Sequence, residues 1–271
     1  MEKYTLITGA TGGLGGAFVQ ECLKRNHNLV LTGTKVKVLE ALEKQIKENY
    51  PNIKVVCLAC DLSSEEDRQS FFTYLKDNNI QINFLINNAG YIAEGEFLNH
   101  SDDEIMKIIK VNCEGTTDFT QKVIKARDKD EDLQILTVSS MAGDYPMPYM
   151  AIYSATKAMV TNLMMALAYE LKNERVYITT VCPSGIPTTD AMKEAIKAQG
   201  VGGKMTMCSP EEVARLSMIA LSKHKIVYYP KVINRFIKGI SRLCSEKSLT
   251  KIVGKRWKKS QAKRNFKTEV K

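Results

Sequence analysis

The sequence predicts an α/β fold in a single domain, with a doubly wound parallel sheet covered by helices on both faces. Apolar, β-branched segments alternate with helix-like segments over most of the 271 residues, and the connections between them are short. That alternation is typical of parallel βαβ units. A glycine cluster also stands where the first strand would pass into the first helix, as a sharp backbone turn requires.

The expected elements follow in order from the amino terminus. Residues 4–8 and 29–32 are continuous apolar runs that predict buried strands. The helix at 14–24 starts within the glycine cluster, and the helix at 36–49 ends before Pro51. The same patterns predict further strands at 53–58, 84–86, 133–138 and 176–181, and further helices at 64–76, 101–110, 113–127, 152–172 and 210–221.

Composition limits the class of protein. No apolar run approaches the roughly 20 residues that cross a bilayer, and the amino terminus enters the first strand without the pattern of a secretory signal. A cytoplasmic address is therefore expected. The histidines and cysteines are scattered, so no metal site is expected, and Cys57 and Cys60 are interpreted as structural thiols.

Positive charge is concentrated at the end of the chain. Residues 223–271 carry sixteen Lys and Arg against two Glu, so residues 1–222 are net acidic. We therefore expect a domain at 1–222 and a basic extension at 223–271, which opens with a short last strand at 226–229.

Three residues near the middle of the chain have the spacing of an acid–base site. Tyr153 and Lys157 are four residues apart, so both side chains stand on one face of the predicted helix. Ser140 lies thirteen residues before Tyr153, just after a predicted strand. A nearby ammonium lowers the pKa of a phenol, which makes a tyrosine usable as a general acid or base. Taken alone, an ordinary Tyr–Lys pair on an exposed helix face explains the spacing equally well.

The segment TGATGGLG at residues 8–15 is a candidate dinucleotide site. Glycines let the backbone approach a pyrophosphate closely, and amides at the start of the helix face the anion. The sheet is therefore expected to be Rossmann-like. A tight turn without a ligand is the alternative interpretation.

In this order the motifs resemble those of the short-chain dehydrogenase/reductase family, in its compact single-domain branch. The glycine loop matches TGxxxGxG, residues 87–90 match NNAG, and Asn112 matches the helix asparagine of the family's active site. Ser140, Tyr153 and Lys157 match its Ser and YxxxK. The resemblance covers nearly the whole first domain, which is therefore expected to be catalytic.

The resemblance implies a role for each matched residue. Tyr153 would exchange a proton with the substrate oxygen, Ser140 would hold that oxygen, and Lys157 would lower the phenol pKa and bind the nicotinamide ribose. Asn112 would place a water in a proton relay behind Lys157. One departure is Ser184, which stands where the family's PGxxxT segment has glycine. The implied cofactor contacts are Gly9, Thr11, Gly13, Leu14, Gly15, Thr34, Lys35, Asp61, Leu62, Asn88, Ala89, Gly90, Tyr153, Lys157, Ile186 and Thr188.

NADP(H) is the expected cofactor, with NAD(H) as the alternative. An acidic residue at the end of the second strand would bind the free 2′-hydroxyl of NAD and repel a 2′-phosphate. The chain instead has Gly33, Thr34 and Lys35 there, with Lys37 nearby. A hydroxyl and a cation without a carboxylate favour the phosphate.

The substrate cavity is expected between the residues after Ser140, those before Tyr153, and a lid formed by residues 189–208. Met141 and Met147 are expected to contact substrate together with Ser140 and Tyr153. Methionines and aromatics suit an apolar, adaptable pocket, although core packing explains many of them. The other apolar residues of these stretches are Tyr145, Pro146, Tyr149, Ile152, Met192, Ile196, Met205 and Met207, and a glycine-rich part of the lid at 200–203 is expected to be mobile.

The basic extension is expected to form amphipathic helices. From residue 232 apolar residues recur at helical spacing among Lys and Arg, and a second such segment spans about 249–259. Helices of this kind bind at a membrane interface, or they pack beside the substrate mouth or a second subunit; both interpretations stay open. No recognition motif accompanies the charge, so nucleic acid is not an expected partner. The resemblance implies a homodimer or homotetramer.

Three functions are compatible with these observations. The preferred one is an NADP-dependent oxidoreductase that transfers a hydride between nicotinamide and a hydrophobic ketone or secondary alcohol, of acyl or steroid-like type. A 3-ketoacyl reductase of lipid or polyketide synthesis is the alternative among enzymes. A non-catalytic NADP-binding regulator or membrane-surface scaffold is the alternative from another class, and the intact Ser140, Tyr153, Lys157 and Asn112 argue against it.

Overall fold

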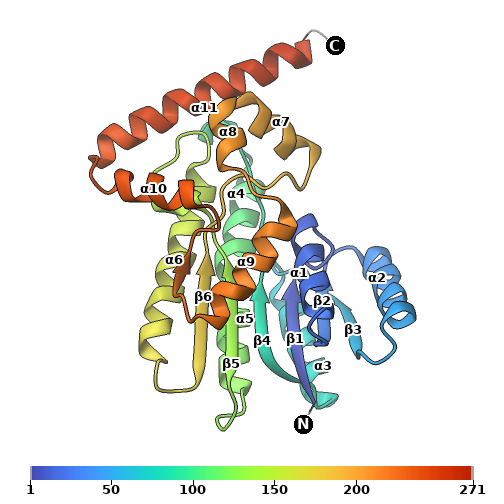
Figure 1. Ribbon diagram of the computed structural model, residues 1–271. Coiled ribbons are helices and arrows are strands. Elements are labelled where there is room, and N and C mark those ends of the chain that lie inside the picture. The colour runs from blue at the N-terminus through green and yellow to red at the C-terminus, as the bar shows by residue number, and fades with distance from the viewer. Residues whose placement is uncertain (1, 270–271) are drawn as a thin grey trace.

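Seven parallel strands form one sheet in the order β3-β2-β1-β4-β5-β6-β7 (Figure 1). This computed structural model describes residues 2–269, with side chains to residue 262. The strand order reverses between β1 and β4, and the carboxyl ends of strands at such a switch point form a ligand crevice. The expected doubly wound fold is thus confirmed. The strands are β1 (Lys3–Thr8), β2 (Asn28–Gly33), β3 (Val55–Ala59), β4 (Gln81–Asn87), β5 (Leu133–Val138), β6 (Val176–Val181) and β7 (Val227–Tyr228).

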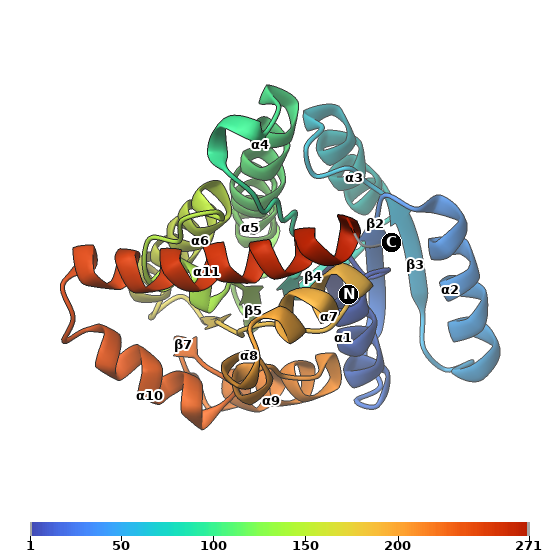
Figure 2. The same ribbon diagram turned by 90° about the horizontal axis from the view of Figure 1, so that it is seen from above.

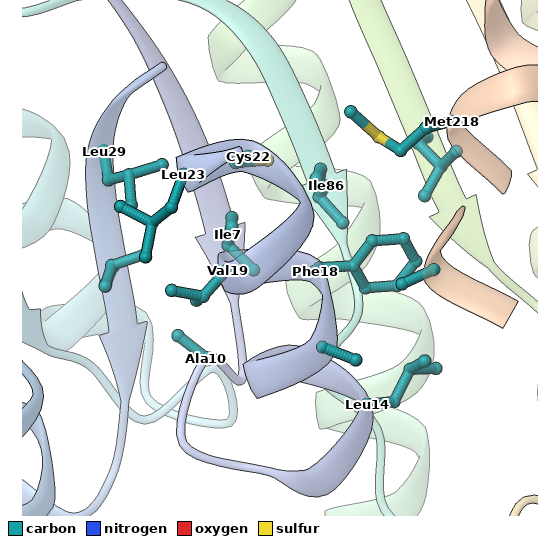
Figure 3. Packing of buried hydrophobic residues seen from close by; sticks show 14 of the residues in the cluster. Ile7, Ala10, Leu14, Phe18, Val19, Cys22, Leu23, Leu29, Ile86 and Met218 are labelled. Atoms are coloured by element: carbon teal, nitrogen blue, oxygen red, sulfur yellow. The ribbon is translucent and has the colours of Figure 1, made fainter. Parts of the chain in front are cut away.

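Three helices cover one face of the sheet: α1 (Gly13–Leu23), α2 (Val36–Asn49) and α9 (Pro210–Ser222). Figure 3 shows Phe18 of α1 packed beside Ile86 of β4 and Met218 of α9. Alternate residues of β1 point to opposite faces, so Ile7 joins this cluster and Leu6 joins the other one. The packing of α1 against the sheet fixes the glycine loop that precedes it.

The other face is covered by α3 (Glu65–Asp77), α4 (Asp102–Ile109), α5 (Thr116–Ala126) and α6 (Ala151–Glu170). Phe71 of α3 and Phe119 of α5 pack with ring centroids 5.2 Å apart. The two helices expected at 101–110 and 113–127 are joined without a break by a π-helical segment, η2 (Lys110–Gly115). Single π-helical turns are frequent at functional sites, and this one carries Asn112.

The C-terminal part of the chain gathers at the carboxyl ends of the strands. Helices α7 (Asp190–Ala198) and α8 (Val201–Thr206) form the region expected as a lid, and Gly200 joins them with φ +69°. After β7 come α10 (Val232–Ser241) and α11 (Glu246–Glu269), and α11 crosses above α7 and α8 (Figures 1 and 2). The last two residues of the expected extension, 270–271, lie outside the described range. None of the described helices is long and apolar enough to span a bilayer.

Candidate active site

The glycine loop after β1 and the turn after β4 are locked together. The Thr8 hydroxyl oxygen accepts hydrogen bonds from the backbone amides of Asn88 and Ala89, both at 3.0 Å. Gly9 has φ +66°, and a Cβ there would lie 2.9 Å from the Ala89 Cα atom. A Cβ on Gly15 would lie 2.0 Å from the Gly9 carbonyl oxygen. A side chain at Gly9 would therefore force the loop and the turn apart, and one at Gly15 would distort the loop itself.

A groove of about 500 Å³ runs along the carboxyl ends of the central strands. Its lining includes all sixteen residues that the sequence predicted as cofactor contacts. The amino terminus of α1 opens into it without a side-chain cap or an acidic residue in its first turn, so its amides are available to a diphosphate. Gly13 packs closely against Thr188: a Cβ on Gly13 would lie 3.0 Å from the Thr188 side chain.

One end of the groove is built from the ends of β2 and β3. Gly33, Thr34 and Lys35 line it, as does Asp61. The Asp61 carboxylate accepts hydrogen bonds from the Ser63 amide at 2.9 Å and hydroxyl at 2.7 Å. Burial raises the pKa of Asp61, but these hydrogen bonds outweigh it and hold the pKa below its ordinary value. Asp61 therefore lies here as an anion, within a fixed turn.

At the other end of the groove, Ser140, Tyr153 and Lys157 meet beside Gly90. The Ser140 hydroxyl lies close enough to the Tyr153 hydroxyl to act on its pKa, which it lowers. The Lys157 ammonium donates to the Val138 carbonyl oxygen at 2.9 Å and lies 5.8 Å from the centroid of the Tyr153 ring. A strand end and one face of α6 thus bring the three expected catalytic side chains together.

Burial dominates the protonation of this group. It raises the pKa of Tyr153 to about 12, with the nearby Ser140 hydroxyl acting in the opposite direction. Burial also lowers the pKa of Lys157 to about 8. Both side chains are almost fully enclosed, and removing a charged group from water disfavours its charged form. Desolvation is therefore the largest cause of both pKa shifts.

Asn112 is fully buried and its amide is engaged. Its Oδ1 atom accepts from the Tyr91 amide at 2.8 Å, and its Nδ2 atom donates to the Tyr91 carbonyl oxygen at 2.9 Å and the Thr156 hydroxyl at 3.0 Å. A Cβ on Gly90 would lie 3.5 Å from both Asn112 Oδ1 and Lys157 Nζ. Asn112 therefore ties the turn after β4 to α6, next to the Lys157 ammonium.

The neighbouring serines point in different directions. Ser140 lines the groove, and its hydroxyl accepts from the Ala142 amide at 3.1 Å. The buried Ser139 hydroxyl instead donates to the Lys157 carbonyl oxygen at 3.0 Å and bonds the Thr161 hydroxyl at 2.7 Å. Ser139 therefore fixes the α6 backbone, while Ser140 is free to contact a ligand.

An apolar cavity of about 160 Å³ adjoins the catalytic end of the groove. The four expected substrate contacts, Ser140, Met141, Met147 and Tyr153, all line it. Tyr145, Met192 and Ile196 also do, whereas Pro146, Tyr149, Ile152, Met205 and Met207 are not among its lining residues.

The roof of this cavity was not predicted from the sequence. Val253, Arg256 and Trp257 of α11 and Ile237 of α10 line it from the C-terminal extension. Packing beside the substrate mouth was one open interpretation of that extension, but its spacing pattern gave no sign of which residues face inward. Lys107 of α4, which lines the cofactor groove, was also missed because no motif includes it.

Comparison with known proteins agrees with this geometry. The family model described as short chain dehydrogenase matches residues 3–200. A very-long-chain 3-oxoacyl-CoA reductase of Neurospora crassa is 32% identical over 200 residues, which cover 70% of this chain and 60% of the relative. Human 17-beta-hydroxysteroid dehydrogenase type 3 is 28% identical over 233 residues, covering 79% of this chain and 73% of the relative.

A short-chain dehydrogenase from Sphingobium yanoikuyae in complex with NADPH superimposes with a TM-score of 0.75 at 25% identity, covering 89% of this chain and 94% of that one. The chain spans about three fifths of the length of several of the curated relatives it matches. The family model covers well over half of the residues, with the groove and the catalytic side chains within or close to its range. The chain therefore belongs to the short-chain dehydrogenase family.

Proposed function

We propose that the chain is an NADP(H)-dependent oxidoreductase that interconverts a hydrophobic ketone and its secondary alcohol. One observation carries the proposal: Ser140 and Tyr153 line both the dinucleotide groove and the apolar cavity. A nicotinamide entering from one side and a carbonyl entering from the other would meet at these two hydroxyls. Nicotinamide, when bound, supplies or accepts the hydride.

The side chains supply the proton and the orientation. In reduction the Tyr153 hydroxyl gives a proton to the oxygen on which negative charge develops, and the Ser140 hydroxyl donates a hydrogen bond to the same oxygen. A phenol whose pKa is raised by burial stays protonated at neutral pH, which suits the acid role. Lys157 places a cationic group behind the phenol, and Asn112 and Val138 hold that region in position.

NADP(H) rather than NAD(H) is favoured by Thr34 and Lys35 at the end of β2, where no carboxylate stands against a 2′-phosphate. The NADPH complex of the Sphingobium relative supports the same choice.

For the substrate, the relatives named 3-oxoacyl-CoA reductases favour a 3-oxoacyl thioester over a steroid ketone. Arg256 lines the cavity and is hydrogen-bonded to Gln199 at 2.8 Å, so it places a cation at the wall where a substrate with an anionic end would lie. We also propose a homodimer or homotetramer through α5 and α6. The apolar side chains of Met159, Met165 and Tyr169 are exposed on α6, which supports that contact.

Turnover with a panel of ketones and both cofactors tests the function. NADPH oxidation should depend on 3-oxoacyl thioesters or bulky ketones and should fall about 10²- to 10⁴-fold in Tyr153→Phe, the range typical of a lost general acid. NADPH binding should survive in that variant. Unchanged turnover in Tyr153→Phe would refute the mechanism, and NADPH binding without turnover of any substrate would favour the regulator.

A further inference from the structure

Helix α10 carries an apolar row on its solvent side, in addition to Ile233 and Ile237, which are partly buried. Its apolar residues Val232, Phe236 and Ile240 are 73%, 65% and 47% exposed, and Leu243, just after the helix, is 88% exposed. Spacings of four, four and three residues place them along one side of the helix. We call these four residues the outer row.

Polar contacts fix the rotation of α10 about its axis. The Lys238 ammonium pairs with the buried Asp144 carboxylate at 2.5 Å. Asn234, also buried, donates to the Thr206 carbonyl oxygen at 3.3 Å. Turning the outer row inward would break both contacts and leave the Asp144 carboxylate buried without its cation, which is strongly unfavourable. The exposure of the outer row is therefore built into the fold.

The next helix shows the ordinary arrangement. In α11, Leu249, Val253 and Trp257 are partly buried toward the protein, and Val253 and Trp257 pack near the active site. The extension thus buries apolar residues of α11 against the protein, whereas the outer row of α10 stays exposed. An exposed apolar row of this kind marks a surface that binds a partner.

The charges around the outer row indicate the partner. Residues 231–245 contain four Lys and Arg and no acidic residue; Lys238 is paired with Asp144, which leaves Lys231, Arg235 and Arg242. Residues 223–271 together carry sixteen basic residues against two Glu. A symmetric contact between two copies through this row would bring the same cations together. An anionic bilayer satisfies both features, since headgroups attract the cations and the acyl region accepts the apolar side chains.

We propose that the outer row is a docking surface for an anionic lipid membrane, with α10 lying in the interface and Leu243 at its leading edge. Lys231 and Arg242 stand beside the row for contact with headgroups. Ile237 of the same helix lines the apolar cavity, so docking brings that cavity close to lipid. The proposal is independent of the reaction that the site catalyses.

Co-sedimentation with vesicles tests it on the full chain. Vesicles of equal parts phosphatidylcholine and phosphatidylserine should bind the protein, and phosphatidylcholine alone should bind it weakly. Phe236→Ser combined with Leu243→Ser should weaken binding about tenfold or more, because two inserted side chains are lost. Leu98→Ser is the matched control, since Leu98 is 91% exposed and lies outside α10, outside the groove and cavity, and outside the oligomer contact proposed on α5 and α6. Salt should weaken binding by screening the cations.

Equal vesicle binding by the wild type and the outer-row variant would overturn the proposal. So would a loss of oligomer mass in that variant without any effect on vesicles, which would assign the row to a second copy. NADPH binding and melting temperature should stay unchanged, because both substituted side chains point into solvent and line neither cavity.

A native cysteine allows a second measurement. Cys244 is exposed beside Leu243, whereas the other six cysteines are buried or partly buried. A nitrobenzoxadiazole dye on Cys244, in a Cys57→Ala background, should brighten and shift to the blue with anionic vesicles. Emission that does not change while the protein co-sediments would place the contact elsewhere and contradict the proposal.

Discussion

The Lys157 ammonium donates a hydrogen bond of 2.9 Å to the Val138 carbonyl oxygen, which ties one face of α6 to the carboxyl end of β5. Ser140 follows that strand and Tyr153 lies one turn before Lys157 on the helix. One contact thus sets the distance between the group that would hold the substrate oxygen and the group that would protonate it.

Substitution of the two adjacent serines should have different effects, one on catalysis and the other on stability. Ser140→Ala should lower kcat about 10²- to 10³-fold, because a donor to the developing oxyanion is lost. Ser139→Ala should leave kcat within a few-fold but lower the free energy of unfolding by about 1 kcal/mol, since its buried hydroxyl holds the α6 backbone. Steady-state kinetics and urea unfolding of both variants provide the measurement. Equal losses of kcat would contradict these roles.

The buried Lys157 should make stability depend on pH. Burial lowers the pKa of Lys157 from 10.5 to about 8, so between these values the unfolded chain binds more protons and stability rises with pH. Relative to Lys157→Met, the wild type should gain about 3 kcal/mol across that window, at about 1.4 kcal/mol per pKa unit. Below pH 8 both states hold the charged amine and the difference should be constant. Urea unfolding of the pair at a series of pH values checks this, and a flat difference would argue against a buried lysine.

Lys35 should discriminate between the two cofactors. Lys35→Ala should weaken NADPH binding about tenfold and NADH binding little, because a charge-assisted contact to a phosphate is lost. Lys37→Ala is the control, since Lys37 is close in sequence but is not among the residues that line the groove. Cofactor fluorescence titration gives both affinities. An equal loss for NADPH and NADH would remove Lys35 from the recognition of the 2′-phosphate.

The roof of the substrate cavity should affect substrate binding. Trp257→Ala removes apolar surface from the cavity wall, so KM for a hydrophobic ketone should rise about tenfold. Ile252→Ala, on the outer side of α11 with 61% exposure, should change KM little. Kinetics with a short and a long substrate would show the effect, and similar KM values in all three proteins would mean that α11 does not cover the bound substrate.

Local sequence rules accounted for most of the fold. The strand predicted at 176–181 appears with those bounds as β6, and the helix predicted at 152–172 appears as α6 with Tyr153 and Lys157 on one face. The glycine loop likewise formed between β1 and α1. Strand runs, helix spacing and glycine turns depend on neighbours within a few residues, so they can be read from the chain directly.

Burial and long-range contact required the tertiary structure. The sequence predicted that Lys157 lies beside Tyr153. It did not predict their burial, which raises the pKa of Tyr153 and lowers the pKa of Lys157. It also gave two basic amphipathic segments with similar patterns. Contacts such as the pairing of Lys238 with Asp144, 94 residues away, leave the outer row of α10 exposed, while Val253 and Trp257 of α11 pack near the active site. A helical pattern defines two faces, and which face is buried depends on partners that lie far away in sequence.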